Sequence, residues 1–353
     1  MPFSPVPIES KRDINKAGHI LTDKNSSVDD MEWALDLADR WRACHAYPIN
    51  TFQATLRRKL SNYPGEPLVA QRLKRMPTII DKLKRLPNMQ LSTMQDIGGV
   101  RAILDSTDEV YRLASSYKNK SNKSRFAHEL INEKDYIQQP RSEDGYRSLH
   151  LIYRYKNPQH PYYDGLRLEL QIRTKLQHIW ATAVETMGTF LGQALKSRQG
   201  DQQWIDFFAI TSSAFANKEK CPAIPRYNTL SYKETALEVS NANAKLGALD
   251  MMKGLSVAVN YITNEGRGWS YHLIILNSLE RTVQLRPYDR DSLEQAMSDL
   301  AKLEKEASEG RKIEPVLVSA GPVSILRRAY PNFFLDIDEF VRVTSEIISS
   351  TQK

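Results

Sequence analysis

The sequence has few cysteines and no long apolar run, and both features narrow the class of protein. Its 353 residues include only 2 cysteines, Cys44 and Cys221, with no CxxC pair and no histidine at metal-ligand spacing. This argues against a disulfide framework and against zinc. Apolar runs such as 273–276 are far too short to span a bilayer, and no signal-peptide core opens the chain. We therefore expect a cytoplasmic protein without a membrane partner.

Low-complexity blocks and internal repeats are also missing, and 41% apolar with 26% charged residues is near the globular average. A chain of this length exceeds the usual single core, which predicts a large domain with a smaller domain or an appended module. Lysine and arginine number 49 against 42 aspartate and glutamate, giving a net charge of +7. This charge favours polyanionic ligands such as nucleotide phosphates or nucleic acid.

Apolar periodicity predicts an α/β region followed by a small α+β module. The stretch 166–172 alternates strictly, so Arg167, Glu169 and Gln171 share one face of a strand. A proline-containing stretch at 218–227 indicates a linker. We expect further strands at 98–104, 148–155, 255–262, 269–276, 282–287 and 315–319, and helices at 29–60, 69–86, 174–195, 204–215, 291–308 and 336–348.

Two clusters carry groups suited to phosphate chemistry. The first is a basic stretch opposed only by Asp81, which either grips a triphosphate or forms a solvated basic face. In the second, Asp96 precedes a glycine turn and a strand bearing Arg101, an arrangement that suits a Mg²⁺ ligand beside a phosphate contact, or a structural turn. The cations of the first cluster are Arg72, Lys74, Arg75, Lys82, Lys84 and Arg85.

A third cluster, Glu169-Leu170-Gln171-Ile172-Arg173, presents alternate polar side chains together. A partly buried carboxylate there could bind a metal or take the proton from an attacking hydroxyl. Between the second and third clusters lie Lys-Asp-Tyr-Ile at 134–137 and Gly-Tyr-Arg-Ser-Leu-His at 145–150.

The joint order of these motifs resembles the RelA/SpoT synthetase domain, the alarmone synthetase fold, over about residues 30–215. The resemblance implies a nucleotidyltransferase-like α/β fold with a mixed sheet flanked by helices. It also implies a Mg²⁺-dependent pyrophosphokinase that moves the β,γ-diphosphate of ATP to a ribose hydroxyl. Such a transfer needs positioning and charge neutralisation more than covalent help, which suits cations, a metal site and an aromatic platform.

The resemblance also implies a role for each matching residue. Asp96 and Glu169 would hold Mg²⁺, and Glu169 would also activate the acceptor hydroxyl. Tyr146 would stack on the acceptor's base. The ATP phosphates would be bound by Arg72, Lys74, Lys82 and Arg101, and the acceptor with the transferred diphosphate would lie among Lys134, Arg147, His150, Gln171 and Arg173. Core packing of Tyr146 and a structural role for His150 are the alternatives.

Two departures from the family pattern stand out. The usual loop Pro-Lys-x-Asn-Gly-Tyr is replaced by residues 140–146, which are longer by one residue and have Asp144 where Asn is common. Among the properties that the resemblance implies, the use of a guanine nucleotide as acceptor is therefore the one that this sequence supports least. No His-Asp dipeptide occurs among the 7 histidines, so the family's hydrolase domain is missing and a synthesis-only enzyme is expected.

A basic loop predicts which acceptor is used. Lys118, Lys120, Lys123 and Arg125 alternate with Ser and Asn, and they suit an RNA backbone better than a mononucleotide, unless they form an ordinary surface loop. The family includes toxic small synthetases that pyrophosphorylate the 3′ CCA end of tRNA. We therefore expect tRNA as the acceptor and inhibition of translation as the result.

The tail resembles that of CapRel-like fused toxin-antitoxin proteins of phage defence. There a pseudo-zinc-finger module ends in a Tyr-x-x-Tyr element over the ATP site, and a phage structural protein, commonly the capsid protein, releases it. Here Tyr330 and Phe333 occupy the corresponding positions, and packing against the last helix is the equal alternative. The resulting division is an extension at 1–28, a synthetase domain at 29–217 and a regulatory module at 228–353.

Two other functions remain open from the sequence. One is a (p)ppGpp or (p)ppApp synthetase with a mononucleotide acceptor. The other is a non-catalytic RNA-binding or partner-binding protein on the same fold, against which the pair Asp96 and Glu169 argues.

Overall fold

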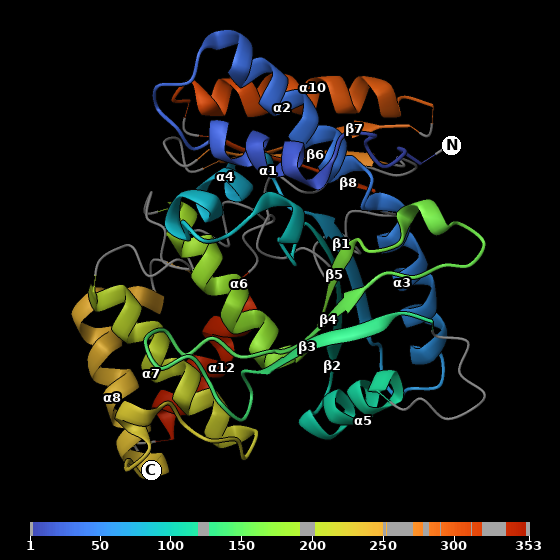
Figure 1. Cartoon of the computed structure of the whole chain (residues 1–353). Coiled ribbons are helices and arrows are strands. Elements are labelled where there is room, and N and C mark those ends of the chain that lie inside the picture. The colour runs from blue at the N-terminus through green and yellow to red at the C-terminus, as the bar shows by residue number, and fades with distance from the viewer. Residues whose placement is uncertain are drawn as a thin grey trace. The chain divides into compact units, whose positions relative to one another are not determined.

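The computed structural model describes residues 3–118, 127–190, 202–249, 252, 271–277, 282–289, 291–311, 313–319 and 337–350 (Figure 1). The chain divides into two compact units. Unit 1 contains residues Met1–Lys134 and Leu149–Ile172, and unit 2 contains residues Asp135–Ser148 and Arg173–Lys353. No helix among the described residues has the length and apolarity needed to cross a membrane.

A five-stranded sheet forms the centre of unit 1, in the order β1-β2-β5-β4-β3. Strands β1 and β2 pair antiparallel with Arg72 opposite Gly99, and β4 and β5 pair antiparallel with His150 opposite Gln171. The strands are β1 (Leu68–Leu73), β2 (Gly98–Leu104), β3 (Glu129–Asp135), β4 (Leu149–Arg154) and β5 (Arg167–Thr174). The expected α/β fold with a sheet flanked by helices is confirmed, as are the strands expected near 98–104, 148–155 and 166–172.

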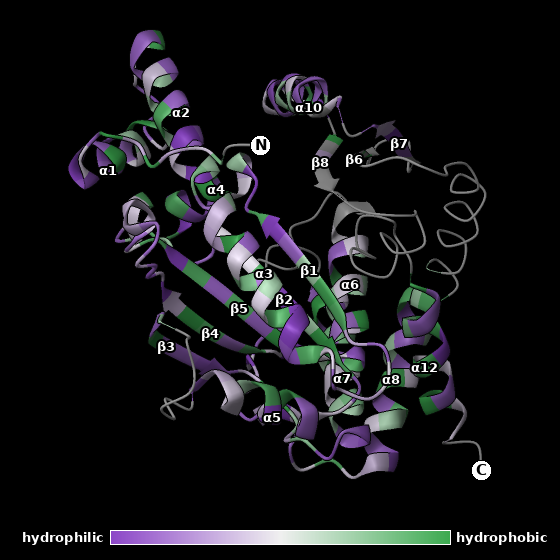
Figure 2. Cartoon of the chain, turned by 90° about the vertical axis from the view of Figure 1, so that its right-hand side faces the viewer, coloured by the Kyte–Doolittle hydropathy of each residue, from purple (hydrophilic) through white to green (hydrophobic). Residues whose placement is uncertain are grey.

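One face of this sheet is apolar and packs against helices. Helix α3 (Ala46–Leu60) contacts β1 and β2, and α5 (Thr107–Lys118) contacts β2 (Figure 2). A Cβ added at Gly98 would lie 2.7 Å from Leu168 and 3.1 Å from Ile49, so α3 packs closely on the strands there. The opposite face is left for the polar side chains of β2, β4 and β5.

The prediction of a single helix at 69–86 is wrong, because this stretch forms strand β1 followed by helix α4 (Met76–Arg85). Pro77 lies in the first turn of α4, where its missing N–H is not needed, and so starts a helix there. The residues before it pair with β2 instead. Arg72 therefore lies on a strand, while Lys82 lies on a helix.

The remaining helices of unit 1 precede its sheet. Helix α1 (Lys11–Ile20) begins at a Ser10 capping box and packs against α2 (Val28–Ala43) and α4. The expected helical stretch 29–60 is thus confirmed as α2 and α3, separated at Cys44 and His45. Short 3₁₀ helices complete the unit at η1 (Leu91–Thr93) and η2 (Pro161–Tyr163).

Unit 2 contains a group of four helices and a small sheet. Helices α6 (Lys175–Phe190), α7 (Gln202–Lys218), α8 (Tyr232–Leu246) and α12 (Asp338–Ser349) contact one another. The Phe340 ring of α12 is fully buried, with its centroid 5.6 Å from the ring of Phe215 and 5.9 Å from that of Phe208. The last helix of the chain therefore packs on α7, a helix of the predicted synthetase domain.

The small sheet of unit 2 has the antiparallel order β7-β6-β8 and is covered by α10 (Leu293–Ser308). Its strands are β6 (Tyr271–Asn277), β7 (Thr282–Tyr288) and β8 (Ile313–Ser319), packed around Leu273, Leu300 and Ile313. The strand expected at 255–262 lies outside the described residues. A 3₁₀ turn η4 (Pro225–Tyr227) falls in the predicted linker. The domain boundaries expected at 217 and 228 remain predictions.

Candidate active site

Asp96, which lies on the segment before β2, forms ion pairs with two lysines. Lys74 Nζ lies 3.0 Å from Asp96 Oδ2, and Lys82 Nζ lies 2.8 Å from Asp96 Oδ1. Lys74 directly follows β1, where its N–H donates to the carbonyl of Ile97 at 2.8 Å, and Lys82 comes from α4. Two residues predicted to bind ATP phosphates therefore meet a predicted metal ligand.

Burial sets the protonation of this cluster. Burial lowers the pKa of Lys74 to about 8, although the Asp96 carboxylate opposes the change. Burial also opposes ionisation of Asp96, but the charges of Lys74 and Lys82 outweigh it and hold the Asp96 pKa well below its ordinary value. The carboxylate is therefore ionised at neutral pH.

A second cluster centres on Glu169, on the polar face of the sheet. His150 Nδ1 on β4 lies 2.8 Å from Glu169 Oε1, and Gln171 Nε2 donates to Glu169 Oε2 at 2.7 Å. Arg101 of β2 donates to Gln171 Oε1 from Nε at 3.2 Å and from Nη2 at 3.0 Å. Four predicted site residues from three neighbouring strands thus form one connected network.

The two carboxylates lie close enough to interact electrostatically. Burial raises the pKa of Glu169 and the negative charge of Asp96 raises it further, but His150 and Gln171 outweigh both and bring it to about 2. Gly99 contributes to the open space between the clusters, since a Cβ there would meet only backbone oxygens, at 3.8 Å or more. The expectation that Asp96 and Glu169 form one metal site stays a prediction, and the structure places the two carboxylates within range of each other's charge.

The implied Mg²⁺ fits this pair of residues. Mg²⁺ prefers oxygen ligands and is commonly held by one or two carboxylates together with substrate phosphates and water. Asp96 and Glu169 are both ionised and supply such oxygens. Among the described residues no group of three or more His, Cys, Asp or Glu gathers as a metal site, so the remaining ligands would come from ATP and water.

The loop that carries Tyr146 belongs to unit 2. Tyr146 is 8% exposed; its ring lies 4.6 Å from the Arg141 guanidinium and 5.7 Å from the Tyr136 ring, which meets it edge on. Asp144 is buried, accepts from Arg141 Nε at 3.1 Å and accepts from the Tyr146 N–H at 3.0 Å. Asp144, which stands where the family commonly has Asn, therefore holds the Arg141 guanidinium against the Tyr146 ring.

Two arginines predicted to contact the acceptor have internal partners within unit 2. Arg147 is 3% exposed and donates to the Ser212 hydroxyl and the Ile137 carbonyl, both at 3.1 Å. Burial lowers the pKa of Arg147 to about 10. Arg173 is also 3% exposed and is hydrogen bonded to His178. These contacts indicate that both arginines stabilise unit 2 through internal hydrogen bonds.

The other predicted residues have varied positions. Lys134 is exposed on β3, an edge strand, and Arg72 is half-buried on β1, the other edge strand. Lys118 forms an ion pair with Glu133. Lys120, Lys123, Arg125, Tyr330 and Phe333 lie outside the described residues. The sequence reasoning gave no role to Arg141, although it lies in the loop 140–146, and it missed Ser212, which lies in no motif and is brought to that loop only by the fold.

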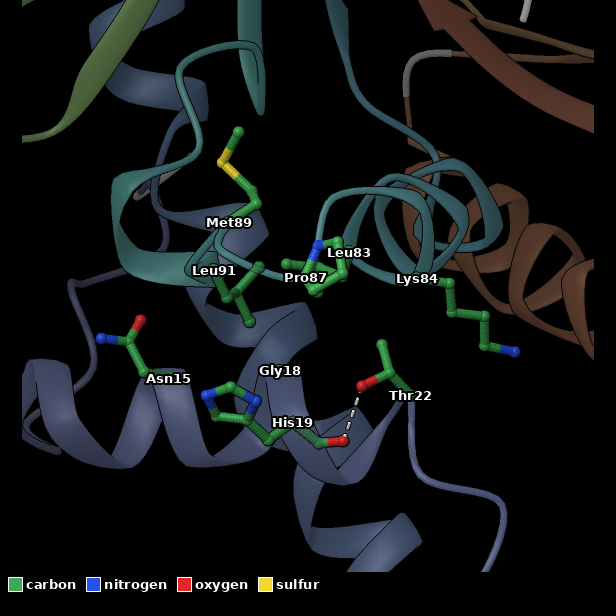
Figure 3. A pocket seen from close by; sticks show the side chains of 9 residues that line it. All are labelled: Asn15, Gly18, His19, Thr22, Leu83, Lys84, Pro87, Met89 and Leu91. Carbon is green, nitrogen blue, oxygen red and sulfur yellow. Dashed lines mark hydrogen bonds between the residues drawn. The ribbon is translucent and has the colours of Figure 1, made fainter.

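A hollow of about 280 Å³ lies elsewhere in unit 1, between α1 and the segment from α4 to η1 (Figure 3). Gly18, Leu83 and Leu91 are among its lining residues, as is Asn15, which accepts from the Ser92 N–H at 3.0 Å. Neither Asp96 nor Glu169 lines it. The candidate active site is therefore the polar sheet face, where the carboxylates and cations meet.

Comparison with known proteins places a family region over this site. Residues 71–188 match the model described as the region found in RelA / SpoT proteins. This is narrower than the 30–215 expected from the motifs, but it contains Asp96, Glu169 and every cation of the two clusters. Residues 71–188 of this chain thus resemble the region found in RelA / SpoT proteins.

Individual relatives cover only part of the chain. An uncharacterized protein of Mycobacterium tuberculosis is 32% identical over 140 residues, which are 39% of this chain and 46% of that protein. The GTP pyrophosphokinase YjbM of Bacillus subtilis is 26% identical over 163 residues, 44% of this chain and 72% of the relative. The chain thus spans about half the length of the Mycobacterium relative.

Among solved structures, the small alarmone synthetase 1 of Bacillus subtilis bound to its product pppGpp is 21% identical to this chain. The match covers 52% of this chain and 92% of that one, with a TM-score of 0.42.

Proposed function

We propose that the chain is a Mg²⁺-dependent pyrophosphokinase that transfers the β,γ-diphosphate of ATP to a ribose hydroxyl. The observation that carries this proposal is that Asp96, paired with Lys74 and Lys82, lies close enough to Glu169 for its charge to act on that second ionised carboxylate. The family region at 71–188 supports the same reaction. In it the hydroxyl oxygen bonds to the β-phosphorus and loses its proton to water, while the bond from that phosphorus to the α-phosphate oxygen breaks and AMP leaves.

The two lysines exchange partners when the donor binds. In the free protein Lys74 and Lys82 neutralise Asp96. Bound Mg²⁺ would be held by Asp96 and Glu169, and there it would neutralise charge on the transferred diphosphate. The lysines, released from Asp96, would then bind the ATP phosphates, with Arg72 and Arg101 assisting. The resting ion pairs thus hold the phosphate-binding cations ready without a bound anion.

Glu169 is better suited to binding metal than to accepting a proton. His150 and Gln171 occupy both of its oxygens, and its pKa of about 2 makes it a weak base at neutral pH. Its role as general base, implied by the resemblance, requires the His150 contact to change on substrate binding. The metal-binding role requires no change in its protonation.

For the acceptor we propose the 3′ CCA end of tRNA, on the strength of the basic stretch at 118–125 and the Asp144 departure in the acceptor loop. Transfer there would block translation, and a tail element at Tyr330 and Phe333 would restrain the enzyme until a phage structural protein such as the capsid protein binds. The second candidate is a guanine mononucleotide, favoured by relatives named GTP pyrophosphokinase.

Labelled-phosphate transfer tests the proposal. Purified wild-type chain and its Tyr330→Ala variant, in which the proposed tail restraint is removed, are each incubated with Mg²⁺, ATP labelled in the γ-phosphate, and either bulk tRNA or GDP, GTP and AMP. Label in RNA supports the tRNA-modifying toxin, and label in a small nucleotide supports the mononucleotide synthetase. If no acceptor is labelled and Asp96→Asn with Glu169→Gln changes no measurable property, a non-catalytic binding protein replaces both.

A further inference from the structure

A serine of α7 is hydrogen bonded to the chain on both sides of Tyr146. Ser212 Oγ donates to the carbonyl of Gly145 at 2.5 Å and accepts from Arg147 Nε at 3.1 Å. The same guanidinium donates from Nη1 to the Ile137 carbonyl at 3.1 Å. Ser212 is 2% exposed and Arg147 is 3% exposed, so these hydrogen bonds form away from water. Losing one of them would leave a buried donor or acceptor without a partner, which lowers the stability of the fold.

Gly145 brings the loop into direct contact with the helix. Its φ is +80°, a left-handed conformation that side chains rarely adopt, and a Cβ there would lie 2.7 Å from Ser212 Cβ. The Gly145 N–H donates to the Arg141 carbonyl at 2.9 Å, which closes the turn. Only glycine allows this turn to lie against α7 with the Ser212 hydroxyl on its carbonyl.

The helix that carries Ser212 is a firm support. Nearly all residues of α7 from Trp204 to Ala216 are buried. Trp180 of α6 donates its indole N–H to the Phe208 carbonyl at 2.8 Å, and Phe340 of α12 packs against Phe208 and Phe215. The position of Ser212 is therefore fixed by two other helices.

We propose that Ser212 is a positioning residue for acceptor binding, holding Tyr146 through the backbone of Gly145 and the side chain of Arg147. This rests on the proposed function, which assigns the acceptor's base to Tyr146. Because the loop that carries Tyr146 is held in place before binding, the acceptor is spared the entropy of ordering that loop, and only the Arg141 guanidinium over the ring must move aside for a base to stack. Arg147 acts through the loop in the same way and does not bind the acceptor itself.

The test compares Ser212→Ala with Ser213→Ala in the full chain. Ser213 is the adjacent buried serine of α7 and accepts from the Ile224 N–H at 3.3 Å, without any hydrogen bond to the Tyr146 loop. For whichever of GDP, GTP, AMP or tRNA the wild type labels, Ser212→Ala should raise the acceptor KM about five- to tenfold, the worth of one buried hydrogen bond. The KM for ATP should change less than twofold, and Ser213→Ala should leave both constants near wild type.

Hydrogen exchange separates failure of this inference from failure of the proposed function. Amides at 141–147 should exchange faster in Ser212→Ala and not in Ser213→Ala, whether or not any acceptor is labelled. Unchanged exchange there, or an equal rise in the KM for ATP, overturns the positioning role. If neither the wild type nor Tyr330→Ala labels any acceptor, faster exchange in Ser212→Ala shows a purely structural contact, which overturns the positioning role and removes the proposed function as well.

Discussion

Lys74 places its ammonium nitrogen 3.0 Å from a carboxylate oxygen of Asp96, in a site where burial lowers the lysine pKa to about 8. The second oxygen of Asp96 is bound by Lys82 at 2.8 Å. A residue expected to bind phosphate therefore loses its charge only one pH unit above neutrality, and this makes its role testable.

The first prediction concerns alkaline pH. Because the pKa of Lys74 is lowered, its cation is present below about pH 8 and is lost as pH rises through that value. The kcat/KM for ATP, which reports the free enzyme, should fall up to about tenfold per pH unit above this point. Lys74→Arg should move the fall to higher pH, since a guanidinium stays protonated. Lys84→Arg, an exposed change on α4, is the control, and an identical profile in Lys74→Arg contradicts the assignment.

The second prediction concerns the metal ligands. Asp96→Asn and Glu169→Gln should each lower kcat by about 10²- to 10³-fold or more, because each removes a charge that orients the metal against the developing phosphate charge. Label transfer measures the effect, and thermal unfolding shows that each variant is folded. Asp81→Asn is the matched control, since Asp81 is an exposed acid on α4 paired with Arg85. Near-normal kcat in both site variants would exclude the proposed chemistry.

The third prediction concerns acid stability. The folded pKa of Glu169, about 2, is below its ordinary value of 4.5, so its contribution to stability is present above about pH 4.5 and is lost as pH falls toward 2. In urea unfolding at several pH values, Glu169→Gln should flatten this part of the stability curve by about 2–3 kcal/mol. A slope equal to that of wild type would mean that the His150 contact contributes nothing.

The fourth prediction concerns the last helix. Phe340→Ala should lower the free energy of unfolding by about 3–5 kcal/mol, since the ring is fully buried among three phenylalanines of α7. Leu237→Ala on α8, where the side chain is 52% exposed, should cost under about 1 kcal/mol. Equal midpoints in urea for the two variants would show that α12 is dispensable for the helical group.

The fifth prediction concerns self-inhibition. Expression of Tyr330→Ala should slow growth of the host, if the tail restrains the synthetase, and the added Asp96→Asn change should restore growth. Point substitution is the proper test, because deletion of residues 325–353 also removes α12 and exposes the α7 rings that it covers. Normal growth with soluble, active Tyr330→Ala protein would contradict inhibition by this element.

Sequence reasoning predicted well where local pattern and chemistry coincide. The alternation of residues 166–172 predicted the polar face of β5. Lys74 and Lys82 contact Asp96, whereas the shared metal site of Asp96 and Glu169 stays a prediction. It failed at 69–86, where basic residues can support a helix as well as an edge strand and only pairing with β2 decides. It also could not reveal that Arg147 is buried, since its partner Ser212 lies 65 residues further along the chain.

The packing of α12 on α7 has a consequence for synthesis of the protein. Chains emerge from the ribosome N-terminus first, and buried rings must wait for their partners. Phe340 packs against the rings of Phe207, Phe208 and Phe215, and it is made long after the RelA/SpoT-like region at 71–188. A nascent chain therefore cannot complete the helical group of unit 2 until α12 has been translated. The proposed restraint at Tyr330 and Phe333 precedes α12 in the sequence, so it emerges from the ribosome before that helical group is complete.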